Sequence, residues 1–517
     1  MRPPNKSMFY SSSSLFLALG LATPLLFFLL VLSNQGSSPS NSSAWRVHTS
    51  DFRPLFVSSS ILESQSNYTT TFNNGSSASL VVLVEVAANY TIFNGSSASP
   101  IFINGSSDID QDTVNTTRVV RRYSKLGRLE ASLVKARAAI REAALVRNMS
   151  SIHQDPDYVP YGPLYRNANA FHRSYLEMEK LFKVYVYKEG ELPLFHDGPC
   201  KNIYSTEGRF IHEMERGKFY RTTDPDEALV YFLPFSVVWM VQYLYELDSH
   251  DTNSIGRVVK DYIHVISNNH PFWNRSLGSD HFMLSCHDWG PRTSASVPNL
   301  LHRSIRVLCN ANTSEGFNPT KDATLPEINL LTGEITKLVG GPSPSRRPIL
   351  AFFAGRLHGH IRYLLLKHWK DKDTDVQVYE KLPKGVSYYT MLRKSRFCLC
   401  PSGYEVASPR VVEAIYTGCI PVLISDGYVP PFSDVLNWKA FSVEIQVKDI
   451  ENIKSLLRRI STRQYLRLQR RVKQVQRHFL VNGNPKRFDV FHMTMHSIWL
   501  RRLNIQIYNQ SAFSVNS

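Results

Sequence analysis

The chain has 517 residues, 43% of them hydrophobic, so it can bury a large core, and its length indicates two or three folding units. Lysine and arginine number 59 against 43 aspartate and glutamate residues, which gives a net charge of +16. This excess suits nucleic acid, a membrane surface or an acidic polymer as partner, and equally a solvated basic surface that binds nothing.

An uncharged apolar stretch, 15–32, is long enough to span a membrane. Arg2 and Lys6 precede it, and no lysine or arginine follows until Arg46. This asymmetry predicts a type II signal anchor, with 1–14 as a cytosolic tail and the rest of the chain in the secretory lumen. A cleaved signal peptide is the alternative, although its apolar core usually has about 7–15 residues. Both readings exclude nucleic acid as a partner.

Residues 33–120 are rich in serine, asparagine and glycine and repeat the sequence NGSSAS. This composition cannot supply a hydrophobic core, so we expect a disordered, glycosylated stem. Asn-x-Ser/Thr sequons are dense in this stem and recur further along the chain. The candidate N-glycosylation sites are Asn41, Asn67, Asn74, Asn89, Asn94, Asn104, Asn115, Asn148, Asn274, Asn312 and Asn509.

The six cysteines would meet an oxidising compartment, so we expect disulfides. Cys398 and Cys400 lie two residues apart on an expected strand and point to the same side, which predicts that they pair elsewhere. The spacing of the cysteines does not resemble a zinc site, and it leaves their connectivity open.

Residues 121–150 predict a helix. Its apolar residues form one stripe at alternating spacings of three and four: Leu126, Leu129, Leu133, Ala136, Ile140 and Ala143. About three heptads are the minimum for a coiled coil, so this stem helix could join the chain to a second copy or to another protein. Packing of the stripe on the main body is the equal alternative.

From about residue 170 the sequence alternates short β runs with helical stretches. The expected strands are 183–187, 229–235, 281–286, 305–310, 349–355, 376–380, 397–401, 420–425 and 441–445. Continuous apolar strands between amphipathic helices predict parallel sheets that are covered on both faces. A loop-rich passage over 312–346 divides the strands into two sets. We therefore expect two Rossmann-like domains facing a cleft, 170–340 and 345–480, followed by a C-terminal helix and tail over 481–517.

One segment combines helix signals with charged residues. Pro409 suits the first turn of a helix, Ser408 its N-cap, and the helix should end near Gly418. Arg410 and Glu413 then lie in its first turn and one turn further on.

These residues could bind a nucleotide. Ligands of α/β sheets gather at strand carboxyl ends and helix N-termini, and Asp426 ends the following strand. The amides of 409–411 and Arg410 suit a diphosphate, and Glu413 could accept both ribose hydroxyls. The alternative is that Arg410 and Glu413 form only an exposed i,i+3 pair.

The segment FCLCPSGYEVASPRVVEAIYTGCIPVLISDGYVPPFSDVLNW (397–438) closely resembles the exostosin family, glycosyltransferase family 47, especially its plant members. FFAGRLHGHIR (352–362), SDHFMLSCHDWG (279–290) and ALVYFLPF match the same family in consistent order over roughly 180–445. The resemblance implies a GT-B fold, inverting transfer from a nucleotide sugar, and a type II Golgi protein that makes matrix or wall polysaccharide.

The resemblance also suggests roles for single residues. Glu413 resembles the ribose-binding carboxylate of many GT-B enzymes, and Arg356, after an apolar strand, looks like a diphosphate contact beside Arg410. An inverting transfer needs a base. His287 and Asp288, at the carboxyl end of the strand 281–286, are the candidates, and His281 is the reserve. The alternative for each of these residues is an ordinary structural or surface position without a role in catalysis.

No metal is expected, because the arginines would neutralise the leaving diphosphate. The Asp-x-Asp motifs that a metal-dependent GT-A enzyme would use occur at 155–157, 224–226 and 371–375, and none follows an apolar strand. A helix over 448–480 is strongly basic on one face, which suits an acidic, polyuronic acceptor if it binds anything.

We therefore expect a Golgi-luminal enzyme that transfers a hexosyl or pentosyl group from a UDP-sugar to a pectic or hemicellulosic wall polysaccharide. The alternative is a non-catalytic luminal protein of the same fold that binds glycans or assembles complexes. The presence of Arg356, Arg410 and Glu413 together favours catalysis.

Overall fold

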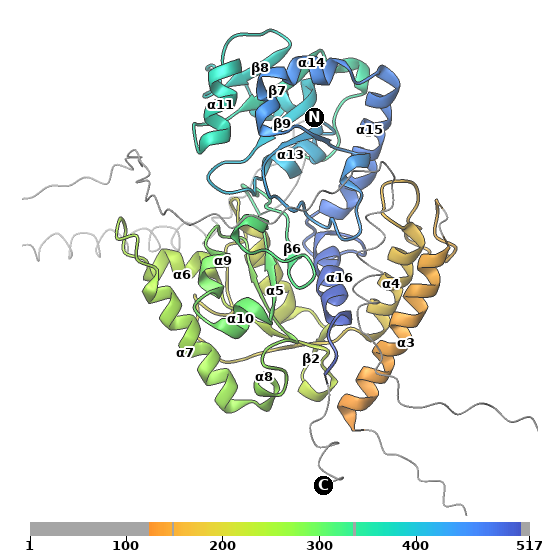
Figure 1. Ribbon diagram of the computed structural model, residues 1–517, viewed down its shortest axis with the longest axis vertical. Coiled ribbons are helices and arrows are strands. Elements are labelled where there is room, and N and C mark those ends of the chain that lie inside the picture. Colours follow the sequence, from red (N-terminus) through yellow and green to blue (C-terminus); the bar gives the residue numbers. More distant parts are fainter. Residues whose placement is uncertain (1–123, 147–148, 334–337, 508–517) are drawn as a thin grey trace, which may run out of the picture. The chain divides into compact units, whose positions relative to one another are not determined.

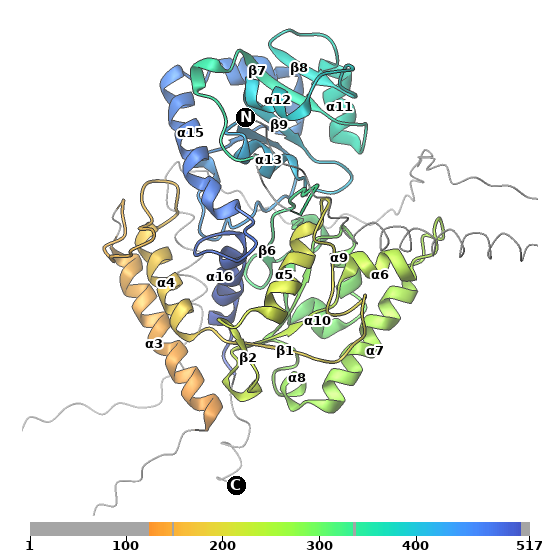
Figure 2. The same cartoon turned by 180° about the vertical axis from the view of Figure 1, so that it is seen from behind.

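Two parallel β-sheets, each covered by helices, make up most of the computed structural model, which describes residues 124–146, 149–333 and 338–507 (Figure 1 and Figure 2). These residues all belong to one compact unit, Gly75–Ser517. The expected cytosolic tail, membrane anchor and stem lie outside them. No helix in the described part of the chain is long and apolar enough to cross a membrane.

The first sheet has six strands in the order β2-β1-β3-β4-β5-β6, and every neighbouring pair is parallel. All four runs that were expected to be strands between 183 and 310 are strands. The sheet also contains two short strands, β2 and β6, that were not expected. The strands are β1 Val184–Val186, β2 Arg221–Thr222, β3 Val230–Leu233, β4 His281–Ser285, β5 Ile305–Leu308 and β6 Ala323–Thr324. The residues of β3, β4 and β5 are all buried, as expected for a parallel sheet covered on both faces.

The second sheet has five parallel strands in the order β11-β10-β9-β7-β8. They are β7 Ile349–Ala354, β8 Val376–Tyr379, β9 Ser395–Pro401, β10 Ile420–Ile424 and β11 Val443–Glu444. The first strand, β7, lies between β8 and β9, so the chain winds in opposite directions on its two sides. Ligands of such sheets bind at this switch point, beyond the strand carboxyl ends.

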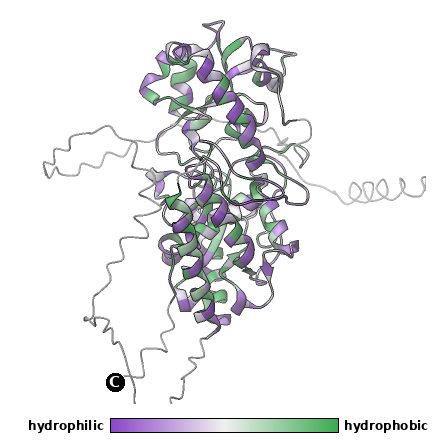
Figure 3. Ribbon diagram, turned by 90° about the vertical axis from the view of Figure 1, so that its right-hand side faces the viewer, coloured by the Kyte–Doolittle hydropathy of each residue, from purple (hydrophilic) through white to green (hydrophobic). Residues whose placement is uncertain are grey.

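The helices cover both faces of the sheets (Figure 2). They are α3 Lys125–Leu145, α4 Ala168–Leu181, α5 Ser205–Arg216, α6 Val237–Leu244, α7 Asn253–Asn269, α8 Pro271–Ser276, α9 Gly290–Ser294, α10 Pro298–His302, α11 His360–Trp369, α12 Tyr388–Lys394, α13 Arg410–Tyr416, α14 Ile453–Arg458, α15 Thr462–Val475 and α16 Val490–Leu503. Figure 3 shows apolar residues in the strands and on inner helix faces, with hydrophilic residues outside. Although α16 follows the second sheet in sequence, it packs on β5 and β6 of the first.

The apolar stripe of the expected stem helix packs on the body of the protein. Within α3, Leu133 and Ala136 are almost fully buried and join the main hydrophobic core. Arg137 donates hydrogen bonds to the carbonyls of Leu503, the last residue of α16, and Ile505 (2.6 and 2.8 Å). Of the two alternatives for this stripe, the structure supports packing on the body, and the stripe is not available for a coiled coil.

The expectation of a single basic helix over 448–480 is wrong. A 3₁₀ segment, Val447–Asn452, leads into α14, and the chain breaks before α15. Ser461 caps α15 with a capping box in which its hydroxyl accepts from the amide of Gln464 and the Gln464 side chain accepts from the Ser461 amide. The apolar periodicity continues through this break, so the spacing of apolar residues in the sequence did not reveal the break.

Two disulfides tie loops and strands together: Cys286–Cys309 and Cys398–Cys419. The expectation that Cys398 pairs away from Cys400 is confirmed, but Cys400 is a buried free thiol and has no disulfide partner.

Loops from the two sheets contact each other directly. The segment after β5 pairs with the segment after β10, where the amide of Thr313 donates to the carbonyl of Gly427 and that of Val429 to Ala311 (both 2.9 Å). The carboxyl ends of strands from both sheets are thereby held close together.

Candidate active site

The switch point of the second sheet carries Arg410, the first residue of α13. Its Nη2 donates to the carbonyl of Ala354 at the end of β7 (3.2 Å), its Nη1 lies 3.4 Å from Ser408 Oγ, and its guanidinium lies over the ring of Phe353. A Cβ at Gly355 would lie 2.5 Å from Arg410 Nη2, so a side chain at this position would displace the guanidinium. Arg410 Nε is buried and has no hydrogen-bond partner among the described residues.

The expected N-cap is wrong by one residue. Pro409, in helical conformation, precedes α13 and no side chain caps the helix. Pro409 also has no amide hydrogen, so it cannot contribute to an amide site. Ser408 is buried, and its hydroxyl faces Arg410 instead of the helix amides.

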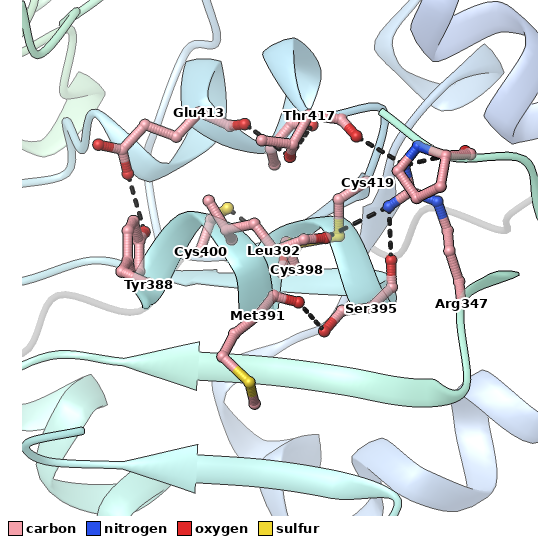
Figure 4. The surroundings of a disulfide bond; sticks show 12 residues. Arg347, Tyr388, Met391, Leu392, Ser395, Cys398, Cys400, Glu413, Thr417 and Cys419 are labelled. Carbon is pink, nitrogen blue, oxygen red and sulfur yellow. Dashed lines mark hydrogen bonds between the residues drawn. A yellow bond between two sulfur atoms is a disulfide. The ribbon is translucent and has the colours of Figure 1, made fainter. Parts of the chain in front are cut away.

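Glu413 lies one turn further along α13 and is only 6% exposed. Its Oε2 accepts a hydrogen bond from the Tyr388 hydroxyl of α12 (2.8 Å; Figure 4). Burial raises the pKa of Glu413, while hydrogen bonding by Tyr388 and the charge of Arg410 act in the opposite direction. The exposed-pair alternative is therefore excluded, because the carboxylate is inside the protein.

A second arginine, Arg362 of α11, was not singled out by sequence reasoning. It is 9% exposed, and its Nε is buried without a hydrogen-bond partner in the described part of the chain. Burial, and to a smaller extent the charge of Arg410, lower its pKa to about 10. Two neighbouring arginines with unpartnered buried nitrogens favour an anionic ligand between or beside them.

Two of the expected nucleotide-binding residues lie apart from this set. Arg356 follows β7 and Asp426 follows β10, and both are exposed. Neither forms an ion pair or a side-chain hydrogen bond with another described residue.

The loop after β4 of the first sheet carries Asp288. Burial raises the pKa of its carboxyl to about 6, although a hydrogen bond with Tyr204 lowers it and the charge of Glu315 raises it. The fully buried Glu207 of α5 holds this loop, since its Oε2 accepts from the amide of Cys286 (2.8 Å). The Cys286–Cys309 disulfide fixes the same loop to the end of β5.

His287 is poorly suited to act as a base. Its Nδ1 accepts a hydrogen bond from the amide of Trp289 (3.0 Å), so in the neutral ring the proton is on Nε2. Burial lowers its pKa to about 4, which keeps the ring neutral near pH 7. The ring can therefore donate a proton in a hydrogen bond, but its one lone pair is already engaged.

His281 is even less accessible. It lies at the amino end of β4, is fully buried, and is flanked by the aromatic rings of Tyr231 and Tyr187. Both of its nitrogens are engaged, Nε2 with the Tyr187 hydroxyl (2.7 Å) and Nδ1 with Asp280 (2.8 Å). The structure therefore gives no support to His281 as a catalytic residue.

Carboxylates from both sheets meet near Asp288. Asn310, just after β5, donates to Glu405 from the loop after β9 (2.6 Å) and to Glu315 (3.1 Å). Burial, followed by the charges of Glu315 and Asp288, raises the pKa of Glu405 to about 7.

Glu327, in the segment after β6, connects the two halves of the site electrostatically. Its pKa is raised well above the ordinary value, first by burial and then by the charge of Asp288, whereas Arg410 and Arg362 lower it and Glu413 raises it. These four side chains, from two sheets, are therefore all within electrostatic reach of one buried carboxyl group.

The three Asp-x-Asp motifs are engaged elsewhere. Asp155 and Asp157 pair with Arg487, Asp224 and Asp226 pair with Lys125, and Asp373 and Asp375 pair with Lys454. Among the described residues no group of three or more histidine, cysteine or acidic side chains is arranged to hold a metal ion.

Two sequons lie in the described part of the chain. Asn274 is exposed on α8, where a glycan would meet solvent. Asn312 is 7% exposed, its Nδ2 donates to Glu315 (3.1 Å), and its Oδ1 accepts from Ser314. The nitrogen that would carry a glycan is therefore buried beside Glu315, so the surroundings of Asn312 suit a glycan less well than those of Asn274.

A scan of protein families matches residues 178–460 to the exostosin GT47 domain. A relative from Arabidopsis thaliana, named a probable glycosyltransferase, is 63% identical over 75% of this chain and 74% of its own length. Two other Arabidopsis relatives are a probable glucuronoxylan glucuronosyltransferase (27% identical; 64% of this chain, 75% of the relative) and a probable beta-1,4-xylosyltransferase (28%; 61% and 81%).

Among solved structures, Anabaena HepE in complex with UDP is similar over 60% of this chain and 97% of that one. The two are 10% identical, with a TM-score of 0.31. The family match covers more than half of the chain, and the Arabidopsis relatives align over most of their own length. The chain belongs to the exostosin GT47 family of glycosyltransferases.

Proposed function

We propose that this enzyme is an inverting glycosyltransferase of GT-B type that transfers a sugar from a UDP-sugar to a cell-wall polysaccharide. The observation that carries the proposal is the convergence on Glu327: Arg362, Arg410 and Glu413 approach it from the second sheet and Asp288 from the first. Cations on one side and a carboxylate of raised pKa on the other suit a leaving diphosphate and a base, respectively.

The donor would bind at the switch point of the second sheet. Arg362 and Arg410 would hold the diphosphate with their unpartnered buried nitrogens, because guanidinium groups bind phosphate oxygens in a bidentate manner. Glu413, oriented by its hydrogen bond from Tyr388, would accept the ribose hydroxyls with its carboxylate oxygens. The two arginines would also stabilise the negative charge that develops on UDP as it leaves.

Asp288 would act as the base. The acceptor hydroxyl oxygen bonds to the anomeric carbon of the sugar while the bond from that carbon to the β-phosphate oxygen breaks, so the electron pair leaves with UDP. The hydroxyl proton passes to the Asp288 carboxylate, and attack opposite the leaving group inverts the anomeric configuration. A base is most efficient when its pKa is near the working pH, which a value of about 6 satisfies better than the ordinary value of about 3.9.

The acceptor class comes from the relatives. Two of them are named for transfer of glucuronosyl or xylosyl groups, one of these on glucuronoxylan, which supports a wall polysaccharide as the acceptor. The uncharged stretch 15–32 and the sequons support anchoring in the Golgi membrane with the catalytic part in the lumen. Alkaline carbonate extraction should leave the full-length chain in the membrane, and endoglycosidase should increase its mobility.

Catalysis without a metal ion is part of the proposal, because Arg362 and Arg410 would supply the positive charge. EDTA should then leave the rate largely intact. A complete loss of activity in EDTA, restored by manganese, would contradict this part.

The experiment that tests the function is a screen of UDP-sugars against the purified luminal portion, with release of UDP measured without an acceptor. Hydrolysis of one UDP-sugar well above the others is expected. Failure of every UDP-sugar to bind or be hydrolysed, from a folded protein, would favour a non-catalytic glycan-binding role.

A further inference from the structure

Helix α15 carries an exposed basic row, Arg463, Arg467, Arg470 and Lys473. Their spacing of three and four residues places them along one face of the helix. No carboxylate in the described part of the chain pairs with any of the four. The row spans about 15 Å, at a rise of about 1.5 Å per residue.

The segment that carries the basic row contains no acidic residue. Between 453 and 479 the sequence has no aspartate or glutamate. Cations just outside the row are engaged: Arg458 pairs with Asp375, Arg471 donates to the carbonyl of Ala440 (3.2 Å), and Arg477 stacks over Tyr158. Exposed Arg459, just before α15, has no side-chain partner among the described residues either, so the fold tolerates the mutual repulsion of these cations.

The opposite face of α15 is used by the protein itself. Tyr465, Gln469, Val472 and Val475 are buried, and the helix packs on β10 and on α13, which carries Glu413. A helix that lies in a membrane surface needs a free apolar face to enter the lipid, and α15 has none. The row also exposes no aromatic ring on which bases could stack.

The helix that carries the basic row has a cavity near it. Through Arg471 and the carbonyl of Ala440, α15 adjoins a cavity of about 380 Å³ at the carboxyl end of β10. Exposed Lys439 and Arg166 line this cavity together with Ser425, whose hydroxyl is buried without a hydrogen-bond partner among the described residues. Exposed Glu444 also lines the cavity, which therefore holds charges of both signs beside an unsatisfied polar group.

We propose that the basic row binds the acidic segment of a polysaccharide acceptor that carries uronate carboxylates along its length. This inference rests on the proposed function and gives its acceptor a chemical class. A linear row of mostly arginine side chains matches a linear polymer of carboxylates, because guanidinium groups pair with carboxylates in a bidentate manner. The row lies outside the donor site, so it would hold the polymer while a distant hydroxyl reacts.

Binding of polygalacturonate to the full chain tests the proposal, with fully methyl-esterified polygalacturonate as the uncharged probe of the same backbone. The wild type should bind the acidic form and not the ester, and added salt should weaken binding. Changing all four residues of the row to Gln should lower the affinity about tenfold or more, and changing them to Glu should lower it further. A variant with Arg257, Lys260 and Arg303, exposed on the first sheet's side, changed to Glu is the matched control and should bind normally.

Equal binding of acidic and esterified polymer, or normal binding by the folded Gln variant, would overturn the proposal. Binding of the row to anionic phosphatidylserine vesicles in place of polygalacturonate would overturn it as well. UDP binding by the wild type, measured in the same preparation, tests the proposed function separately. Polymer binding without UDP binding would contradict that function and leave the basic row supported as an acidic-glycan site.

Discussion

Arg356 and Arg362 lie close in sequence in the segment after β7, but only Arg362 is buried beside Arg410. If Arg362 holds the diphosphate, Arg362→Ala should weaken UDP binding by about 10- to 150-fold, because a hydrogen bond to a charged group contributes about 1.5–3 kcal/mol. Arg356→Ala removes the same charge from an exposed side chain and should change UDP affinity by less than about threefold. Titration calorimetry with UDP measures both, and a larger loss in Arg356→Ala would contradict the placement.

Asp288 should affect activity and stability in opposite directions. Its folded-state pKa of about 6 lies above the ordinary value of about 3.9, so the folded state holds the proton more tightly and loses stability as the pH rises between these values. Asp288→Asn removes this loss, so its Tm should exceed that of the wild type at pH 8 and match it below about pH 4. Transfer should fall by about 10²–10⁴-fold.

The pH profile of the wild type tests the same residue. A base of pKa about 6 must be ionised, so kcat/KM should decline as the pH falls below about 6. A profile that stays flat down to pH 4.5, or an Asp288→Asn variant with normal transfer, would exclude Asp288 as the base.

At the scale of the elements, the packing of α3 shows that the region after the stem is part of the enzyme body. Leu133 is fully buried, so Leu133→Ala should lower the free energy of unfolding by about 2–5 kcal/mol. Val134→Ala, at a neighbouring position that is 57% exposed, is the control and should cost about 0.5 kcal/mol or less. Chemical denaturation measures both. A coiled-coil role would instead change the oligomeric state in Leu133→Ala and leave the unfolding of the body unaltered.

The elements also show which features the sequence could predict. Most strands of both sheets were predictable from short apolar runs bounded by turn residues, whereas β2 and β6, of two residues each, carry too little pattern. The break between α14 and α15 was not predictable. It depends on local capping of α15 by Ser461, and it does not interrupt the spacing of the apolar residues. The N-cap of α13 was misplaced for a similar reason, since Ser408 turns to Arg410 and away from the helix.

The residues of the candidate site likewise include some that the sequence could predict and some that it could not. Arg410 and Glu413 were predictable because they lie on one short helix, where sequence spacing fixes their relation. Arg362, Glu327 and Glu405 reach the site from separate segments, and only the fold brings them together. Arg362 and Glu405 do lie within the motifs FFAGRLHGHIR and PSGYEVASPR, so a signal was present in the sequence, but it did not distinguish them from their neighbours.

For the whole molecule, the paired loops after β5 and β10 and the bond from Asn310 to Glu405 hold the two halves of the site together. The carboxylates on one side and the arginines on the other are therefore already close before any ligand binds. The proposed transfer depends on this arrangement, with the donor held by the second sheet and the base supplied by the first. Mutations should therefore affect donor binding and proton transfer separately.

The most direct test compares Glu413→Gln with Asp288→Asn in UDP binding and transfer. Glu413→Gln keeps the volume and one acceptor but removes the charge, so donor kcat/KM should fall about 10- to 150-fold. Its Tm without nucleotide should hardly move, because burial already disfavours the ionised carboxylate, and UDP should raise that Tm less than in the wild type. Asp288→Asn should lose transfer and keep UDP affinity. A lower Tm with normal UDP affinity in Glu413→Gln would contradict the nucleotide site.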